Sequence, residues 1–354
     1  MSDEIRLMKG NEAIGEAAIR AGCGAYFGYP ITPQNELTQY MATYMVPNGR
    51  VFIQAESEVA AINMVFGAAS TGTRAMTSSS SPGVSLKQEG ISYMCGADLP
   101  AVIVDVARAG PGLGGITPAQ GDYFQATRGG GHGDYHTIVL APKGVQEAAD
   151  LTFEAFDITD KYNIPVLVLA DGLIGQMMEA VKFPAPKDLA TIPPKPWAVG
   201  NQSKGGMVNH ISSMNLDPPS LEIENLERYK RYDVVIKELC KYEEVQVEDA
   251  DLIIVAYGTS ARISQSTLKT AREKGLKVGL FRPITLWPFP YDRLNALAKP
   301  GRKFLAVEMS MGQMVQDVRL AVNGKAPVGH YGRVGGMIHN EEEVLAAVER
   351  MLGE

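Results

Sequence analysis

The sequence is poor in cysteine, with Cys23, Cys95 and Cys240 lying far apart among its 354 residues. An iron–sulfur cluster usually takes four thiolates, several of them in a closely spaced run, and a zinc knuckle needs a similar run. The sequence therefore excludes both kinds of site within this chain and predicts no metal ligands. We expect the three cysteines to be small, buried, apolar side chains. Any iron–sulfur cluster that serves the protein would have to lie on another chain.

Clusters of basic residues and long apolar runs are also missing. The net charge is −7 and no group of Lys and Arg stands out, so we expect no nucleic-acid partner, because such a partner needs cations to neutralise its phosphates. No apolar run is long enough to span a bilayer. The first four residues, Met-Ser-Asp-Glu, lack the basic and then apolar layout of a signal peptide. We therefore expect no membrane partner and a cytoplasmic protein.

The first half of the sequence alternates short apolar runs with helical patterns, and 354 residues suggest about two domains. Strands are expected at residues 25–31, 51–56, 74–79, 101–107, 137–141 and 166–170. Helices are expected between them at residues 11–21, 34–44, 58–70, 84–95 and 145–162. Continuously apolar strands separated by helices indicate a parallel sheet covered on both faces. Right-handed crossovers then predict a doubly wound α/β domain.

The pattern changes after residue 183. Seven of the 21 prolines, together with Gly200, Gly205 and Gly206, lie in or next to the stretch 184–219, which predicts an extended linker. A charged amphipathic helix is expected at about 220–244, packed across the junction. A second, smaller α/β unit follows, with strands at 252–257, 278–281, 304–307 and 328–331 and helices at 260–274, 311–322 and 341–352. We therefore expect domains at 1–183 and 249–354, joined by residues 184–248.

Polar residues follow four strands of the first predicted sheet. Thr32 lies in a proline-flanked turn, Glu56 and Glu58 follow the second strand, a serine-rich turn spans 78–83, and Arg108 ends the fourth strand. The carboxyl ends of parallel strands face one crevice, and ligands collect there. The sequence therefore predicts a binding site at this edge before any family is considered.

Glu58 is the most informative of these residues. Ser57 is placed as an N-cap, and Glu58 opens a helix that is apolar nearly all round, so we expect the helix and its first carboxylate to be buried. Burial raises a carboxyl pKa and a helix N-terminus lowers it, so the sequence predicts no net direction. A plain capping carboxylate is an equally good reading.

Arg108 and Thr32 each have a functional and a structural reading. A guanidinium at the end of an apolar strand suits a carboxylate or phosphate ligand. The structural alternative is an ion pair with Asp105 or with a neighbouring subunit. For Thr32, the structural alternative is a residue that serves the turn and the start of the next helix.

Two further patterns are weak. Residues 110–115 match Gly-x-Gly-x-x-Gly after a strand, which is typical of dinucleotide binding, but Pro118 disfavours the helix that this motif requires. We interpret the segment as a mobile loop over the crevice. His132 and His136 lie in a glycine-rich loop without a helical scaffold. Satisfied or solvent-facing histidines are a better interpretation than metal ligands.

Three motifs of the first half resemble the alpha subunits of 2-oxoacid:ferredoxin oxidoreductases. They are residues 28–33 (Gly-Tyr-Pro-Ile-Thr-Pro), 54–58 (Gln-Ala-Glu-Ser-Glu) and the turn 77–83. Residues 282–290 and 308–313 resemble the second domain of the same family. The resemblance implies a pyrimidine-type thiamine-diphosphate domain followed by a domain like the C-terminal domain of transketolase.

The family resemblance implies a role for five residues. Glu58 would hydrogen-bond the aminopyrimidine ring of thiamine diphosphate and so promote loss of the thiazolium C2 proton. Ser81 and Gly83 would also contact the cofactor, while Arg108 and Thr32 would bind the 2-oxoacid. Coenzyme A would accept the acyl group, and the electrons would leave through iron–sulfur clusters.

What the chain lacks implies its partners. Thiamine enzymes hold Mg²⁺ and the diphosphate with a Gly-Asp-Gly motif, which does not occur here, and Ala170-Asp171-Gly172 lies at the wrong end of its domain. The resemblance therefore implies a beta-type subunit that supplies the magnesium site. It further implies a gamma-type subunit and a ferredoxin-like subunit that carries the clusters.

Residues 110–114 and 122–135 look most like the branched-chain, 2-ketoisovalerate type of the family. The 2-oxoglutarate type usually has Gly-Pro-Ser-Thr-Gly after the arginine, and Gly112-Leu113 departs from it. Three alternatives stay open: a 2-oxoglutarate enzyme, a nicotinamide-dependent dehydrogenase that uses the glycine motif, and a non-catalytic scaffold. The presence of both Glu58 and Arg108 argues against the scaffold.

Overall fold

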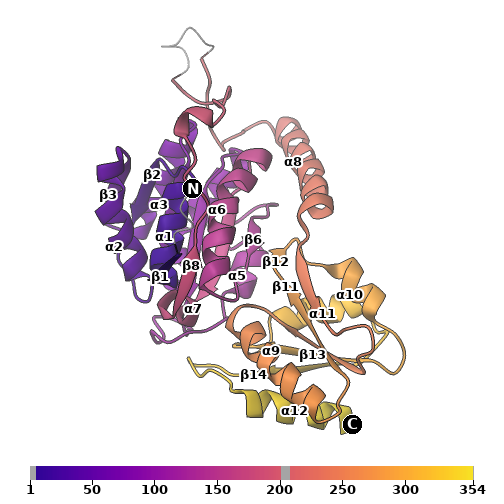
Figure 1. Cartoon of the computed structure of the whole chain (residues 1–354). Helices are drawn as coiled ribbons and strands as arrows, with labels where there is room; N and C mark the ends of the chain where they lie inside the picture. The colour runs from indigo at the N-terminus through magenta and orange to yellow at the C-terminus, as the bar shows by residue number, and fades with distance from the viewer. Residues whose placement is uncertain (1–4, 201–207, 354) are drawn as a thin grey trace.

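The first unit of the protein is built on a seven-stranded sheet (Figure 1). The computed structural model describes residues 5–200 and 208–353. The strand order is β12 (Thr285–Trp287), β6 (Ile138–Leu140), β7 (Val166–Asp171), β5 (Val102–Ala107), β4 (Ala75–Ser79), β2 (Ala25–Gly28) and β3 (Val51–Gln54). Neighbouring strands are parallel except for β12, which pairs antiparallel with β6. The six predicted strands of this sheet are thus confirmed.

Helices cover both faces of this sheet. The central strands β4, β5 and β7 are therefore buried along their whole length. One face packs against α1 (Gly10–Arg20), α2 (Asn35–Tyr44) and α6 (Val145–Tyr162). The other packs against α3 (Glu58–Ser70) and α4 (Pro82–Gly96). The predicted doubly wound α/β fold is confirmed. Smaller elements are η1 (Val46–Asn48), α5 (Tyr123–Thr127), α7 (Gly172–Gln176) and an antiparallel pair formed by β1 (Ile5–Lys9) and β8 (Met178–Lys182).

The second unit is a five-stranded α/β layer. Its order is β14 (Val328–Gly332), β13 (Lys303–Glu308), β10 (Leu252–Ala256), β11 (Val278–Pro283) and β9 (Tyr242–Val245). All neighbours are parallel except β9 and β11. The helices are α9 (Gly258–Glu273), α10 (Tyr291–Leu297), α11 (Met314–Val322) and α12 (Glu341–Gly353). The four predicted strands and three predicted helices are all present.

The segment between the two units contains one correction. The helix expected at 220–244 is α8 (Pro218–Leu239), and it ends five residues early because residues 242–245 pair as β9 with β11. In the linker the described residues form only the short η2 (Leu189–Thr191). Its Gly205 and Gly206 lie outside the described residues, as do the four N-terminal residues discussed above.

α8 packs against the first unit and leads into the second (Figure 1), whereas the sequence predicted a helix packed across the junction. Arg228 donates to the carbonyl of Gly96 at 3.0 Å, and Tyr232 packs edge-on against Trp287 with 5.4 Å between ring centroids. Trp287 belongs to β12, which lies in the second half of the sequence but extends the first sheet. The units therefore share a sheet edge, and we propose domains at 1–183 and 249–354 with 184–248 between them.

Two predictions about burial need correction. Helix α3 is not buried all round, because Val59 is 42% exposed and Asn63 and Gly67 are also exposed. Cys23 and Cys95 are buried, but Cys240 at the end of α8 is only half-buried. Within residues 5–200 and 208–353, no helix has the length and apolarity needed to cross a membrane.

Candidate active site

The site is organised by the turn between β4 and α4. Ser81, the N-cap of α4, has φ 27°, a left-handed conformation that a non-glycine residue adopts only when its surroundings hold it there. Three hydrogen bonds hold this residue. Its N–H donates to Asp105 at 3.0 Å, its hydroxyl donates to Asp122, and it accepts the N–H of Arg108 at 2.9 Å. The turn after β4 is therefore fixed to the end of β5.

Glu58 lies against the first turn of α4. It is 6% exposed, and Ser57 caps its helix by accepting the N–H of Ala60 at 3.1 Å, as predicted. A Cβ on Gly83 would lie 2.8 Å from Glu58 Oε1 and 2.0 Å from Ser79 Oγ. Only glycine leaves room for this carboxylate, so position 83 and Glu58 are spatially coupled. No capping bond to the Glu58 side chain is present among the described residues.

Arg108 and Thr32 are brought together as predicted. Arg108 donates through Nη1 to the carbonyl of Thr32 and through Nη2 to the carbonyl of Leu113, both at 2.9 Å. The guanidinium is buried, and its Nε has no hydrogen-bond partner among the described residues. The hydrogen bonds of this buried guanidinium go to carbonyl groups, the Asp122 carboxyl group lies near enough to interact with its charge, and its unpartnered Nε suits an anionic ligand. The alternative ion pair with Asp105 is not observed.

Asp105 and Asp122 form a buried carboxyl pair that the sequence analysis missed. The two carboxyl groups are hydrogen-bonded to each other, and Asp105 is 1% exposed. Burial and the adjacent Asp122 carboxylate raise the pKa of Asp105 well above its usual value, although the Ser81 N–H acts in the opposite direction. Burial raises the pKa of Asp122 as well, so two negative charges on this pair are disfavoured. Residues 105 and 122 are linked by a long loop, and nothing in their spacing signals this pairing.

Lys87 was also missed. It is fully buried on α4 and donates through Nζ to Thr77 Oγ1 at 2.8 Å and to the carbonyl of Ser78 at 2.9 Å. A signal existed, because Lys87 lies four residues after Gly83 and therefore on the same face of the helix.

A cavity of about 940 Å³ opens beside this cluster, between the two units. Ser81, Arg108 and Asp122 line one side, and Met309, Ser310, Met311 and Gln313 of the second unit line the other. Its apolar lining includes Leu86, Pro111, Met309, Met311 and Val334. The site can therefore present a buried cation and a carboxyl pair next to an apolar wall.

The buried atoms fit the pyrimidine end of thiamine diphosphate. The hydroxyls of Ser79 and Ser80 are buried and lack hydrogen-bond partners within the described part of the chain. Together with Glu58 they offer an acceptor and two hydroxyls beside a glycine, which suits a small polar heterocycle. The Ser81 hydroxyl is already engaged in hydrogen bonds with Asp122 and Arg108. Ser81 would therefore serve the cofactor by fixing the start of α4.

The dinucleotide and metal readings gain no support. No helix begins directly after residues 110–115, where the chain bridges back from Pro118 to Arg108, so the glycine motif offers a pyrophosphate no helix N-terminus. His136 stacks on Trp287 with 4.5 Å between ring centroids. No group of three potential metal ligands occurs in the described ranges 5–200 and 208–353.

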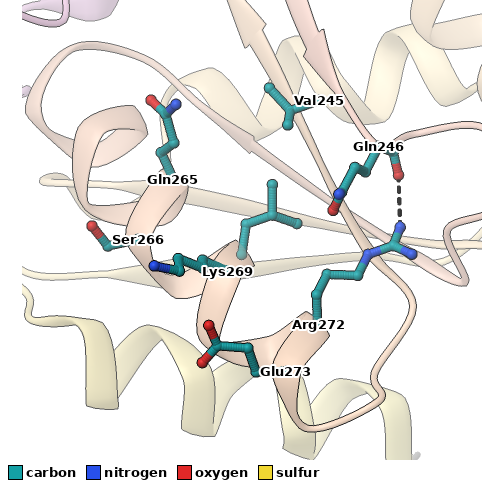
Figure 2. Close-up of a pocket in the computed structure, with 8 residues that line it drawn as sticks. Val245, Gln246, Gln265, Ser266, Lys269, Arg272 and Glu273 are labelled. Atoms are coloured by element: carbon teal, nitrogen blue, oxygen red, sulfur yellow. Dashed lines mark hydrogen bonds between the residues drawn. The ribbon is translucent and has the colours of Figure 1, made fainter.

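A second cavity, of about 710 Å³, lies between α9 and β9 on the second unit (Figure 2). Arg272 at its rim is already held by the carbonyl of Gln246 at 2.8 Å and by both oxygens of Asp249. None of the predicted site residues lines this cavity, and we assign it no role.

Two family models match the chain in sequence order. Residues 16–239 match the thiamine-diphosphate-binding domain of pyruvate flavodoxin/ferredoxin oxidoreductases. Residues 250–344 match core domain II of pyruvate:ferredoxin oxidoreductases.

Individual relatives match over nearly the full length. The chain is 50% identical over 349 residues to ketoisovalerate oxidoreductase subunit VorB of Methanothermobacter marburgensis, covering 99% of this chain and 98% of that protein. It is 35% identical to the 2-oxoglutarate synthase subunit KorA of Methanothermobacter thermautotrophicus, covering 97% and 98%. Among solved structures, 2-oxoglutarate:ferredoxin oxidoreductase from Magnetococcus marinus aligns with a TM-score of 0.86 at 27% identity, covering 99% of this chain and 66% of that one.

Proposed function

The chain belongs to the 2-oxoacid:ferredoxin oxidoreductase family, and from this we propose that it is the subunit that binds the pyrimidine end of thiamine diphosphate in an enzyme acting on 2-ketoisovalerate. The enzyme converts the branched 2-oxoacid and coenzyme A to the acyl-CoA and CO₂ and reduces ferredoxin. The observation that carries the cofactor assignment is the buried Glu58 carboxylate seated against Gly83, where no larger residue fits.

Each of the five site residues has a task in this proposal. Thiamine diphosphate, when bound, supplies the carbon nucleophile that adds to the ketone of the substrate. Glu58 would share a proton with a ring nitrogen of the pyrimidine through a hydrogen bond. Gly83 leaves the space for that contact, and Ser81 fixes the turn that carries Gly83.

Arg108 and Thr32 bind the substrate in our proposal. The unpartnered Nε of Arg108 provides a donor for the carboxylate shared by all 2-oxoacids. Thr32 lies within hydrogen-bond reach of the same guanidinium through its carbonyl. The substrate carboxylate would therefore bind at the carboxyl ends of the strands, the same edge of the sheet as Glu58, and away from water.

The preference for a branched chain rests on the cavity next to Arg108. Among the described residues that line it, Arg108 is the single cation, and the remainder includes five large apolar side chains. A second carboxylate, as in 2-oxoglutarate, would lack a partner in this cavity and cost several kcal/mol if dry. The 50% identity to a ketoisovalerate oxidoreductase subunit supports the same choice.

The chain works as a subunit of a larger complex, and we further propose what its partners supply. A beta-type subunit brings the Mg²⁺ and diphosphate site, since this sequence has no Gly-Asp-Gly motif. A gamma-type subunit and a ferredoxin-like subunit complete the enzyme, with the iron–sulfur clusters on partner chains. We place the complex in the cytoplasm.

Kinetics of the purified native complex test the substrate assignment. We expect kcat/KM for 2-ketoisovalerate to exceed that for 2-oxoglutarate at least tenfold, because one unpaired carboxylate costs more than 1.4 kcal/mol. Arg108→Ala should lower kcat/KM for every 2-oxoacid by a similar factor, since the carboxylate beside the ketone is common to all of them. The exposed Arg350→Ala on α12 serves as the matched control. A tenfold preference for 2-oxoglutarate would overturn the substrate assignment and leave the family unchanged.

A further inference from the structure

Lys87 is a buried cation that the proposed reaction does not use. It is 0% exposed, and its Nζ donates to Thr77 Oγ1 and to the carbonyl of Ser78. Both acceptors are neutral. A lysine taken fully out of water is costly unless a carboxylate lies nearby to compensate its charge. The identity of that carboxylate decides what Lys87 does.

Two carboxyl groups lie near enough to act on the charge of Lys87, Glu58 on α3 and Asp105 on β5. Asp105 already accepts the Ser81 N–H at 3.0 Å and is paired with Asp122, so its carboxyl group is engaged at the turn before α4. Glu58 is therefore the carboxylate left to compensate the ammonium group. Burial lowers the pKa of Lys87 to about 7, while both carboxyl groups act in the opposite direction. A lysine with this pKa depends strongly on its partner to stay charged.

Helix geometry places Lys87 on the same side of α4 as the carboxylate. Gly83 and Lys87 are four residues apart on α4, so they lie one above the other on the face that packs against β4 and α3. Glu58 Oε1 lies over Gly83, 2.8 Å from the position of a Cβ there. Gly83 in the first turn of α4 thus leaves room for the Glu58 carboxylate, and Lys87 in the second turn supplies a cation.

We propose that Lys87 is a positioning residue, whose ammonium group holds the Glu58 carboxylate at the crevice in the orientation that a pyrimidine ring requires. This inference rests on the proposed role of Glu58. It assigns Lys87 no contact with cofactor or substrate.

A double-mutant cycle on the full chain tests the pair without any catalysis. The urea midpoints of wild type, Lys87→Met, Glu58→Gln and the double variant are compared. We expect Lys87→Met to lower the midpoint clearly in the wild-type background and much less in the Glu58→Gln background. Lys87→Gln, which keeps hydrogen bonding but not charge, provides the same cycle if the Met variant does not fold. Thr77→Val is the control, because it removes a neutral partner of Lys87 and should lower the midpoint equally in both backgrounds.

Steady-state kinetics of the assembled enzyme then separate positioning from bulk stability. Lys87→Gln should lower kcat by roughly tenfold to a hundredfold while KM for the 2-oxoacid stays within about twofold, because the substrate carboxylate is bound elsewhere. Adding Lys87→Gln to Glu58→Gln should have little further effect. Additive losses in the cycle, or an unchanged kcat, would overturn the proposal for Lys87. If the cycle shows coupling but the complex turns over no 2-oxoacid, the failure lies with the proposed function instead.

Discussion

At the scale of single residues, Glu58 differs from its neighbour Glu56 in burial and in its place at the start of a helix. Glu58 is 6% exposed at the start of α3, whereas Glu56 is exposed in the loop before it. We expect Glu58→Gln in the assembled complex to slow proton exchange at thiazolium C2 by about 10²–10⁴-fold, the usual effect of removing an acid/base group. The exchange is followed by NMR after mixing into deuterated buffer.

Glu56→Gln is the matched control for this experiment, since it changes the same chemical group two residues away. It should leave the exchange rate unchanged. If Glu58→Gln exchanged the C2 proton at the wild-type rate, Glu58 would not be the activating residue. If both variants lost the same fraction of the exchange rate, the cause would be a general electrostatic effect.

The sequence predicted the individual site residues better than their partners. Ser57 and Glu58 could be placed because a cap and a first-turn residue are local features of a helix. Arg108 and Thr32 could be placed because both follow parallel strands. Asp105 and Asp122 could not be paired from the sequence, since their contact depends on how a long loop returns to β5. Lys87 was overlooked because lysine usually marks a solvent-exposed helix face.

At the scale of elements, the first turn of α4 must lack a side chain at position 83. Gly83→Ala would place a Cβ 2.0 Å from Ser79 Oγ and 2.8 Å from Glu58 Oε1. We expect this variant to lose about 1–3 kcal/mol of stability through overpacking, and to lose most of its activity because Glu58 is displaced. Chemical denaturation of the chain and turnover by the assembled enzyme measure the two effects.

Gly67 on α3 offers the comparison, because a Cβ there meets nothing within 4 Å. Gly67→Ala should raise the stability of the isolated chain by about 0.4–1 kcal/mol, the usual gain from replacing a helical glycine. If Gly83→Ala and Gly67→Ala had the same stability and the same turnover, the crowding at Gly83 would not control the position of Glu58.

Elements that the sequence failed to predict share a physical cause. β9 and β12 are short and contain polar residues, so their strand character comes from pairing with β11 and β6 and not from an apolar run. β1 and β8 are largely exposed and pair only with each other. The strands of the two sheet centres could be predicted because burial on both faces requires continuous apolar sequence.

At the scale of the whole molecule, this chain holds only part of an enzyme. Its three cysteines are widely spaced, and Cys23 and Cys95 are buried with their thiol pKa values raised by burial, which disfavours the thiolate that iron requires. We expect the isolated chain to be colourless, to contain no iron and to turn over no 2-oxoacid. Absorbance spectra and iron analysis of the chain expressed alone provide the measurement. Stoichiometric iron after reconstitution would contradict a separate electron-transfer subunit.

The two units are joined through a buried polar contact centred on Gln120, which is 2% exposed. Its Nε2 donates to the carbonyl of Tyr257 at 2.9 Å, and its Oε1 accepts from Ser260 Oγ at 2.6 Å and from the Met309 N–H at 2.9 Å. This side chain therefore connects the loop beside Arg108 to the start of α9 and to the end of β13. The cavity between the units depends on that connection.

Gln120→Leu keeps the size of the side chain but leaves the Ser260 hydroxyl and the Met309 N–H without a partner, whereas the Tyr257 carbonyl still accepts the Ala261 N–H. Each unsatisfied group costs about 1–3 kcal/mol, so we expect a loss of about 2 kcal/mol or more in the free energy of unfolding. Urea denaturation of the full chain measures this loss. Gln265→Leu, on the exposed face of α9, should change stability by no more than about 0.5 kcal/mol. If the two variants were equally stable, other contacts between the units, such as Thr259 with Asp171 and Tyr123 with Asp317, would be sufficient to hold them together, and Gln120 would contribute nothing to the geometry of the cavity.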